Sequence, residues 1–101
     1  MRCFLFHLMP YASLDLDYDK EYKASWVVYP NSNFDPKVGQ YLYNTYLDEL
    51  EMGEELGFDG LCVNEHHQNA YGIMPSPIVP AAALARRTST AKIAVLGNAF
   101  G

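Results

Sequence analysis

The sequence predicts an α/β fold in which three parallel strands alternate with two helices. Three short apolar runs, at residues 3–8, 60–64 and 92–96, have the length and composition of buried strands. Residues 41–56 follow a helical period, and an alanine-rich segment that ends at residue 87 has the slim apolar face of a second helix. Strands that alternate with helices imply a parallel sheet with right-handed crossovers.

The first strand, residues 3–8, is rich in aromatic side chains and closes at Met9-Pro10. A long loop, residues 10–40, then precedes the first helix, whereas a βα loop usually has about two to six residues. This loop carries many aromatic residues, and we expect it either to cover the edge of the sheet or to form a lid that contacts substrate. Residues 25–29 have the composition of a short additional strand.

The first helix, residues 41–56, carries apolar side chains on one stripe and acidic side chains on the rest of its surface. The stripe consists of Tyr43, Tyr46, Leu47 and Leu50. Gly53 lies one turn before the helix end, where the missing side chain lets the backbone approach a sheet closely. Gly57 suits the left-handed residue that commonly follows a helix.

The second strand, residues 60–64, runs into four polar residues, Asn64, Glu65, His66 and His67. A parallel strand between helices is apolar almost throughout, so this polar run marks the carboxyl end of the strand. Ligands of α/β sheets and barrels bind at that end. Because side chains alternate along an extended chain, we expect His66 and His67 to point to opposite faces.

The second helix is expected to begin near Ser76-Pro77, which reads as a capping residue followed by proline at the first helical position. Pro80 would remove a hydrogen bond from such a helix, so a later start at Val79 or Pro80 is the alternative. The third strand, residues 92–96, leads into a further strand-to-helix loop at Gly97-Asn98-Ala99.

Composition restricts the partners of the chain. Its 101 residues are 50% apolar, enough for one domain over residues 1–101. A net charge of −5 and a pI near 4.9 argue against a nucleic-acid or anionic-membrane surface. No apolar run approaches the roughly 20 residues that span a bilayer. We expect a cytoplasmic protein with two buried, reduced cysteines, Cys3 and Cys62.

The histidines do not favour a metal site. His66 and His67 are expected to diverge, and His7 is the only further histidine, so few ligands can converge on one ion. A metal-dependent hydrolase that uses His7, Glu65 and His66 nevertheless stays as an alternative enzyme class. A non-enzymatic βαβ binding module is the alternative outside the enzymes.

Three stretches, residues 58–67, 81–86 and 93–99, together resemble the bacterial luciferase-like flavin monooxygenases. The most specific part is Glu65-His66-His67. It follows a strand that begins at Gly60, the last residue of the motif Gly57-Phe58-Asp59-Gly60. The family fold is a TIM (β/α)8 barrel of about 250 residues. The resemblance therefore implies that this chain is the amino-terminal part of such a barrel, β-α-β-α-β, with a long first βα loop.

The resemblance also implies a cofactor and a reaction. Relatives hold a flavin at the carboxyl end of the barrel, usually reduced FMN and in some cases the deazaflavin F420. The implied reaction is oxidation of a small organic substrate with reduced flavin and O2, or hydride transfer in the F420 branch. A flavin reductase as electron source and a homodimer of the full-length protein are the implied partners.

Carried onto this sequence, the family pattern places the catalytic histidine at His66. The implied cofactor contacts are Met9, Glu65, Gly97 and Asn98, with a non-proline cis peptide at Gly97-Asn98 or next to it. We expect two aromatic side chains of the loops, Trp26 and Tyr71, to contact substrate. No residue is assigned to a metal.

Overall fold

A computed structural model of the chain describes residues 1–24 and 27–99. Its elements are β1 (Phe4–Phe6), α1 (Pro36–Glu55), β2 (Gly60–Asn64), α2 (Ile78–Arg87) and β3 (Lys92–Leu96). Two short 3₁₀ helices, η1 (Leu16–Lys20) and η2 (Asn31–Asn33), lie in the loop between β1 and α1. The strands are parallel in the order β1-β2-β3, which confirms the predicted fold.

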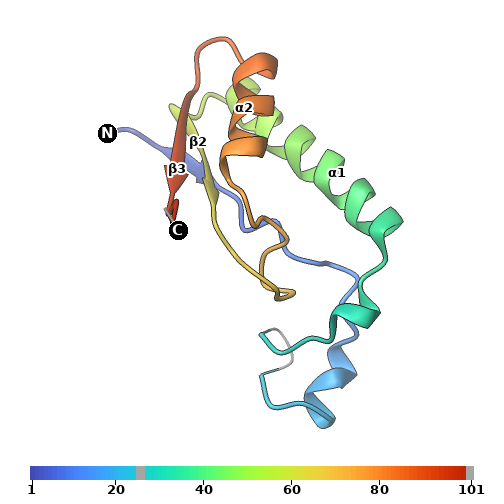
Figure 1. The fold of residues 1–101 in the computed structure, drawn as a ribbon. Coiled ribbons are helices and arrows are strands. Elements are labelled where there is room, and N and C mark those ends of the chain that lie inside the picture. Colours follow the sequence, from blue (N-terminus) through green and yellow to red (C-terminus); the bar gives the residue numbers. More distant parts are fainter. Residues whose placement is uncertain (25–26, 100–101) are drawn as a thin grey trace.

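Both helices cover the same face of the sheet, and the first loop extends away from it as an arm (Figure 1). β2 is the central strand, and all five of its residues are buried. Leu61 of β2 pairs with Leu5 and Ile93 of the neighbouring strands, and these side chains pack toward the helices. Phe4 and Phe6 alternate with Leu5 and are 39% and 45% exposed on the opposite face.

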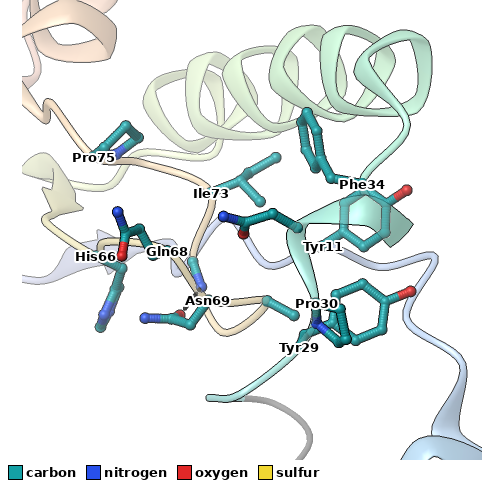
Figure 2. Close-up of a pocket in the computed structure, with 12 residues that line it drawn as sticks. Tyr11, Tyr29, Pro30, Phe34, His66, Gln68, Asn69, Ile73 and Pro75 are labelled. Atoms are coloured by element: carbon teal, nitrogen blue, oxygen red, sulfur yellow. Dashed lines mark hydrogen bonds between the residues drawn. The ribbon is translucent and has the colours of Figure 1, made fainter.

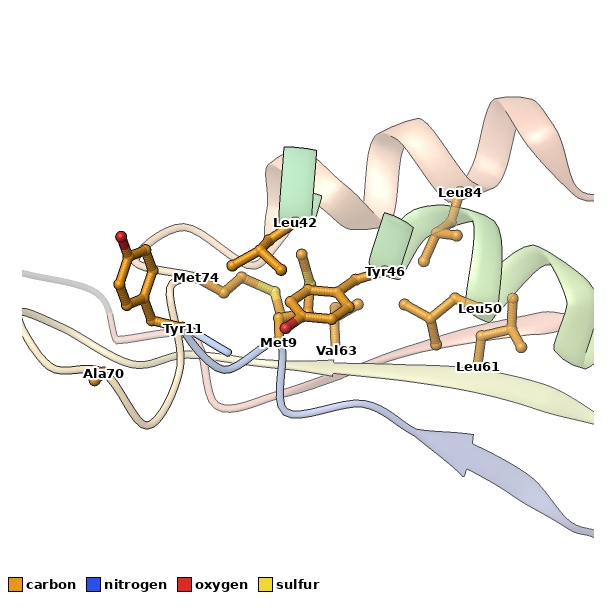
Figure 3. Close-up of a cluster of buried hydrophobic side chains, with 10 residues drawn as sticks. All are labelled: Met9, Tyr11, Leu42, Tyr46, Leu50, Leu61, Val63, Ala70, Met74 and Leu84. Atoms are coloured by element: carbon orange, nitrogen blue, oxygen red, sulfur yellow. The ribbon is translucent and has the colours of Figure 1, made fainter. Parts of the chain in front are cut away.

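The hydrophobic core fills the space between β2 and the two helices (Figure 3). Leu50 of α1, Leu61 of β2 and Leu84 of α2 are fully buried there. Each such side chain stabilises the fold by about 1.5–3 kcal/mol through burial. The cluster continues past the carboxyl end of the sheet to Met9 and Met74, so the same core also supports the loops that follow β1 and β2.

α1 begins at Pro36, five residues before the predicted start at residue 41. The side chain of Asp35 accepts a hydrogen bond from the Lys37 backbone N–H at 2.8 Å and so caps the helix. Pro36 occupies the first helical position, where a backbone N–H has no partner within the helix. Asp35-Pro36 was therefore the start signal, and the prediction overlooked it.

The buried stripe of α1 differs slightly from the predicted one. Tyr46 and Leu50 are buried as expected, but Leu42 takes the place of Tyr43 and Leu47, which are only partly buried. Gly53 has the predicted role, because a Cβ there would lie 2.6 Å from Leu5 Cδ2.

α2 begins at Ile78, with Pro77 as the capping residue and without the expected side-chain cap from Ser76. Ser76 instead contributes its backbone carbonyl, which accepts from the Val79 N–H at 3.1 Å. Pro80 is the third helical residue, and the first intrahelical bond is the one that Ala81 N donates to Pro77 O at 3.1 Å. Pro80 therefore costs the helix no hydrogen bond, which removes the reason for a later start.

β1 is shorter than the predicted strand because the chain turns sharply at Met9, whose φ is 49°.

Both cysteines are free, as expected, but Cys3 precedes β1 and is exposed, whereas Cys62 is buried.

The additional strand expected at residues 25–29 is absent over residues 27–29, where Val27 and Val28 donate to Ala24 O in a turn. Ser25 and Trp26 lie outside the described residues. Within residues 1–24 and 27–99, neither of the α-helices has the length and apolar character that a membrane crossing needs.

Glu54, near the end of α1, holds the segment that leads into β3. Its carboxylate accepts backbone hydrogen bonds from Ser89, Thr90 and Ala91, the last at 2.7 Å, and another from the Thr90 hydroxyl at 2.9 Å. These bonds, with that from Ala91 the strongest cause, lower the pKa of Glu54 to about 2. The ionised form therefore stabilises the folded chain.

We expect Glu54→Gln to lower Tm by a few degrees at pH 7 and to weaken the dependence of Tm on acid. A glutamate of ordinary pKa 4.5 that titrates at about 2 when folded contributes its full stabilisation above pH 4.5. This stabilisation is lost as the pH falls from there toward 2. Thermal unfolding followed by circular dichroism between pH 7 and pH 2.5 measures the effect.

Glu55→Gln is the matched control, because Glu55 is the adjacent, exposed glutamate. It should keep the acid dependence of the unmodified protein. Identical acid profiles for Glu54→Gln and the unmodified protein would contradict the stabilising role of the carboxylate.

Candidate functional site

One residue after each of the three strands has a left-handed backbone conformation. Met9 after β1, Gln68 after β2 and Gly97 after β3 have φ values of 49°, 52° and 83°. Parallel pairing brings these ends to one edge of the sheet, with Asn64 opposite Leu96 in the register. For residues other than glycine this conformation costs on the order of 1–3 kcal/mol, and such strain concentrates at functional sites.

The four polar residues after β2 form two pairs on opposite sides of the chain. Asn64 bonds to His66, and Glu65 bonds to His67. Each pair joins residues two apart, as alternation along an extended segment requires. The predicted divergence of the two histidines is therefore confirmed.

Asn64 fixes His66 and retains one unused acceptor. Asn64 Nδ2 donates to His66 Nε2 at 2.8 Å, so a neutral His66 carries its proton on Nδ1. Asn64 is only 6% exposed, and its Oδ1 is the one buried side-chain oxygen or nitrogen without a partner among the described residues. A buried acceptor left unpaired costs about 1–3 kcal/mol, and Oδ1 is shielded from solvent, so a ligand group could reach it only after the surrounding side chains move.

Glu65 connects the end of β2 to the loop after β3. Its Oε1 accepts from His67 Nε2 at 2.5 Å, and its Oε2 accepts from Ala99 N at 2.7 Å. The bond from His67, followed by that from Ala99, lowers the pKa of Glu65, so the carboxylate is ionised near neutral pH. Glu65 therefore lies beside the Gly97-Asn98 turn, and the cofactor contacts of Glu65, Gly97 and Asn98 stay predictions.

The peptide bonds of the described residues are all trans, so the cis bond expected at Gly97-Asn98 or next to it is wrong. Gly97 makes the turn instead through its own φ of 83°, which glycine adopts without steric cost. A trans bond is also favoured by about 2.5–4 kcal/mol outside proline.

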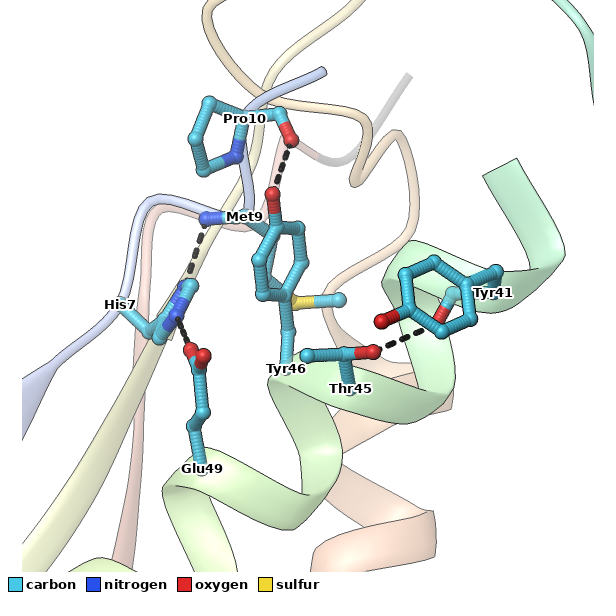
Figure 4. A network of polar contacts seen from close by, with 7 residues as sticks. All are labelled: His7, Met9, Pro10, Tyr41, Thr45, Tyr46 and Glu49. Carbon is cyan, nitrogen blue, oxygen red and sulfur yellow. Dashed lines mark hydrogen bonds and ion pairs between the residues drawn. The ribbon is translucent and has the colours of Figure 1, made fainter. Parts of the chain in front are cut away.

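A polar network from α1 holds the turn after β1 (Figure 4). Met9 N donates to His7 Nδ1 at 2.9 Å, and the other ring nitrogen of His7 donates to Glu49 Oε2 at 2.7 Å. The Tyr46 hydroxyl donates to Pro10 O at 2.7 Å. His7 thus serves the backbone of the turn.

Across the described part of the chain, no cluster of three His, Cys, Asp or Glu side chains could hold a metal ion. The ligand set of the hydrolase alternative, His7 with Glu65 and His66, is not brought together.

The loop after β2 folds back on the loop after β1. Tyr11 N donates to Ala70 O at 2.9 Å, and Ile73 N donates to Met9 O at 2.8 Å. A third backbone bond, from His66 N to Met74 O at 2.9 Å, closes the second loop on itself.

Between the two loops lies a cavity of about 200 Å³ (Figure 2). Aromatic rings from the first loop and polar side chains from the second form its walls, chiefly Tyr11, Tyr29, Phe34, His66, Gln68 and Asn69. Sequence reasoning noted the aromatic residues but not Gln68 and Asn69, because nothing in the sequence shows which loop residues face each other.

The remaining predicted contacts are placed as follows. The ring of Tyr71 packs edge-on against His66, with ring centres 4.9 Å apart, and does not line the cavity. Met9 is fully buried in the core. Its cofactor contact and the substrate contact of Tyr71 stay predictions, and Trp26 lies outside the described residues.

The luciferase-like monooxygenase family matches residues 27–95, about two-thirds of the chain. The chain therefore belongs to the luciferase-like monooxygenase family, and its β-α-β-α-β order is that of part of the family's TIM barrel. Members are oxidoreductases that in general use a flavin or F420. A search of curated proteins found no match.

We expect Gly72→Ala to displace the His66 ring, because a Cβ at residue 72 would lie 2.5 Å from His66 Cδ2. Overpacking of this kind typically costs about 1–3 kcal/mol. NMR spectra of the imidazole should show shifted His66 ring signals, and denaturant unfolding should show the loss of stability.

Gly53→Ala is the matched control, since its Cβ would clash with Leu5 and Leu61, near the start of β2, whereas His66 follows the end of β2. This control should lose stability without moving the His66 signals. Unshifted His66 signals in Gly72→Ala would contradict the close contact.

Proposed function

We propose that this chain forms part of a flavin-dependent monooxygenase that oxidises a small organic substrate with reduced FMN and O2. His66 carries the proposal. It stands at the carboxyl end of β2, lines the cavity and has one ring nitrogen fixed by Asn64. Membership in the luciferase-like monooxygenase family supports an oxidoreductase over the hydrolase and over a non-enzymatic module.

The residues at the strand ends fit the ring system of a flavin. Its pyrimidine edge carries an N–H between two carbonyl groups, and the unpaired Asn64 Oδ1, which is shielded from solvent in the unliganded chain, would accept from that N–H only after becoming exposed. Gly97 leaves its surroundings open, with only Glu65 Cβ, at 4.0 Å, near the position that a Cβ would take. When bound, reduced FMN supplies the electrons for O2 activation. F420 has the same edge and supplies hydride, so it is the alternative cofactor.

His66 is proposed to hold or donate a proton through Nδ1. Nε2 accepts from Asn64, and Nδ1 has no partner among the described residues, so its proton is available to a ligand. An imidazole works as acid or base near neutral pH, and a positioned general acid or base contributes roughly 10²–10⁴ in rate. Asn64 acts through His66 as a positioning residue.

The aromatic residues of the first loop are proposed to keep water away from the reaction. Tyr11 is buried. The centre of its ring lies 5.4 Å from the ring centre of Phe34 and 6.1 Å from the ring centre of Tyr29. Exclusion of water protects a reactive oxidant from hydrolysis and side reactions. In the cell, we expect a flavin reductase in the cytoplasm to supply reduced FMN and the full-length protein to form a homodimer.

The decisive test is turnover of neutral organic compounds by the full-length protein with reduced FMN and O2, with products identified by mass spectrometry. We expect His66→Ala to lower kcat by roughly 10²–10⁴ and to remove an ionisation from its pH profile. His67→Ala removes the adjacent histidine on the opposite side of the chain and should have a much smaller effect.

Titration with FMN and with F420, followed by fluorescence, decides between the two cofactors. Binding of F420 alone would replace the monooxygenase with a hydride-transferring enzyme. Binding of neither, or an unchanged pH profile in His66→Ala, would refute the proposed function.

A further inference from the structure

We propose that the cavity between the two loops binds the substrate, and that this substrate is a neutral single-ring compound with an oxygen acceptor. This assignment rests on the proposed function and specifies its substrate class. Four properties of the cavity support it, namely its volume, the absence of charged residues in its described walls, the unused hydrogen-bond donors in its lining and the fixed position of its aromatic wall.

The volume of the cavity, which is open to solvent on one side, suits a ligand of one ring. A cavity of about 150 Å³ in another protein holds one benzene molecule. The volume here, about 200 Å³, leaves room for one ring with a small substituent. It is smaller than the roughly 300–1,000 Å³ of sites for drug-sized ligands. A three-ring flavin exceeds this volume, so we assign the cavity to the substrate and not to the cofactor.

The walls exclude charged ligands. Among the described residues that line the cavity, none is Asp, Glu, Lys or Arg (Figure 2). Burial, the largest cause, raises the pKa of Tyr29, so its hydroxyl stays neutral near pH 7. A carboxylate or ammonium group taken from water into such walls would lose its hydration without gaining a charged partner.

Three side chains of the lining keep a hydrogen-bond donor. His66 Nδ1 carries a proton without a partner among the described residues, and the exposed Asn31 and Gln68 side chains also form no hydrogen bond within them. The Asn69 amide is already used. Its Oδ1 accepts from the backbone of Tyr71 and Gly72, and its Nδ2 donates to His67 O. Asn69 therefore shapes the loop, and His66, Gln68 and Asn31 are left to bind a ligand oxygen.

The aromatic wall is held in place before any ligand binds. Phe34 lies against Gly39 of α1, so closely that a Cβ at residue 39 would be 2.5 Å from Phe34 Cζ. The Tyr11 hydroxyl accepts from Asp35 N at 3.1 Å. A wall that needs no ordering upon binding loses less entropy and selects ligands by shape.

Ligand-observed NMR on the whole chain tests the assignment without any flavin. Acetophenone is the neutral probe, benzoate is the anionic probe of similar size, and decanal is the elongated neutral probe. We expect saturable binding of acetophenone and affinities for the other two that are weaker by about tenfold or more.

Ile73→Phe fills the cavity and should weaken acetophenone binding by about tenfold or more, because Ile73 lines it. Ile78→Phe makes the same change at an exposed residue of α2 outside the cavity and should leave the affinity unchanged. Gln68→Glu adds a negative charge with almost no change in shape. Gln68→Glu should weaken the binding of acetophenone and create affinity for the cation benzylammonium. It therefore tests the assignment independently if Ile73→Phe does not fold.

Absence of saturable acetophenone binding, equal affinity for benzoate, or binding that Ile73→Phe and Gln68→Glu leave unaltered would overturn the assignment. Because these measurements contain no cofactor, their failure leaves the proposed monooxygenase activity to be judged by its own assay.

Discussion

The candidate site depends on the backbone hydrogen bonds that join the loop after β1 to the loop after β2. Tyr11 donates to Ala70, and Ile73 donates to Met9. These bonds fix the cavity between the loops, and they hold the segment that carries His66 against the segment that carries the aromatic residues. Buried residues from both loops belong to the main core, so burial of apolar surface pays for the strained backbone at Met9 and Gln68.

Much of the fold could be predicted from local sequence patterns. β2 and β3 have the predicted bounds, because a buried strand is an apolar run with clear limits. The errors concern the starts of the two helices, where two local sequence signals favour different first residues. Asp35-Pro36 starts α1 before its aromatic period becomes regular, and Pro80 falls in the first helical turn, where its missing N–H is harmless. The early end of β1 depends on a turn at Met9 that α1 holds through His7, and local sequence does not reveal such a contact.

The sequence predicted only those features of the site that follow from where the parallel strands end. Their common edge brings Glu65 beside the Gly97 turn, and alternation separates His66 from His67, so both features followed from the sequence. The cavity did not, because it requires two loops, distant in the sequence, to face each other. Asn64 was known as a polar residue at the strand end. Its bond to His66 and its unpaired oxygen emerged only from three-dimensional packing.

The burial of β2 decides which of the two adjacent histidines lies on the side of Asn64. Loss of one residue between Cys62 and Glu65 would exchange the two sides of the segment that follows, because side chains alternate with a period of two. His67 would then occupy the side that His66 occupies now, but Glu65 would move into the position of Asn64, which is only 6% exposed. Burial of a carboxylate without a partner is costly, so the fully buried central strand keeps His66 and not its neighbour on this side.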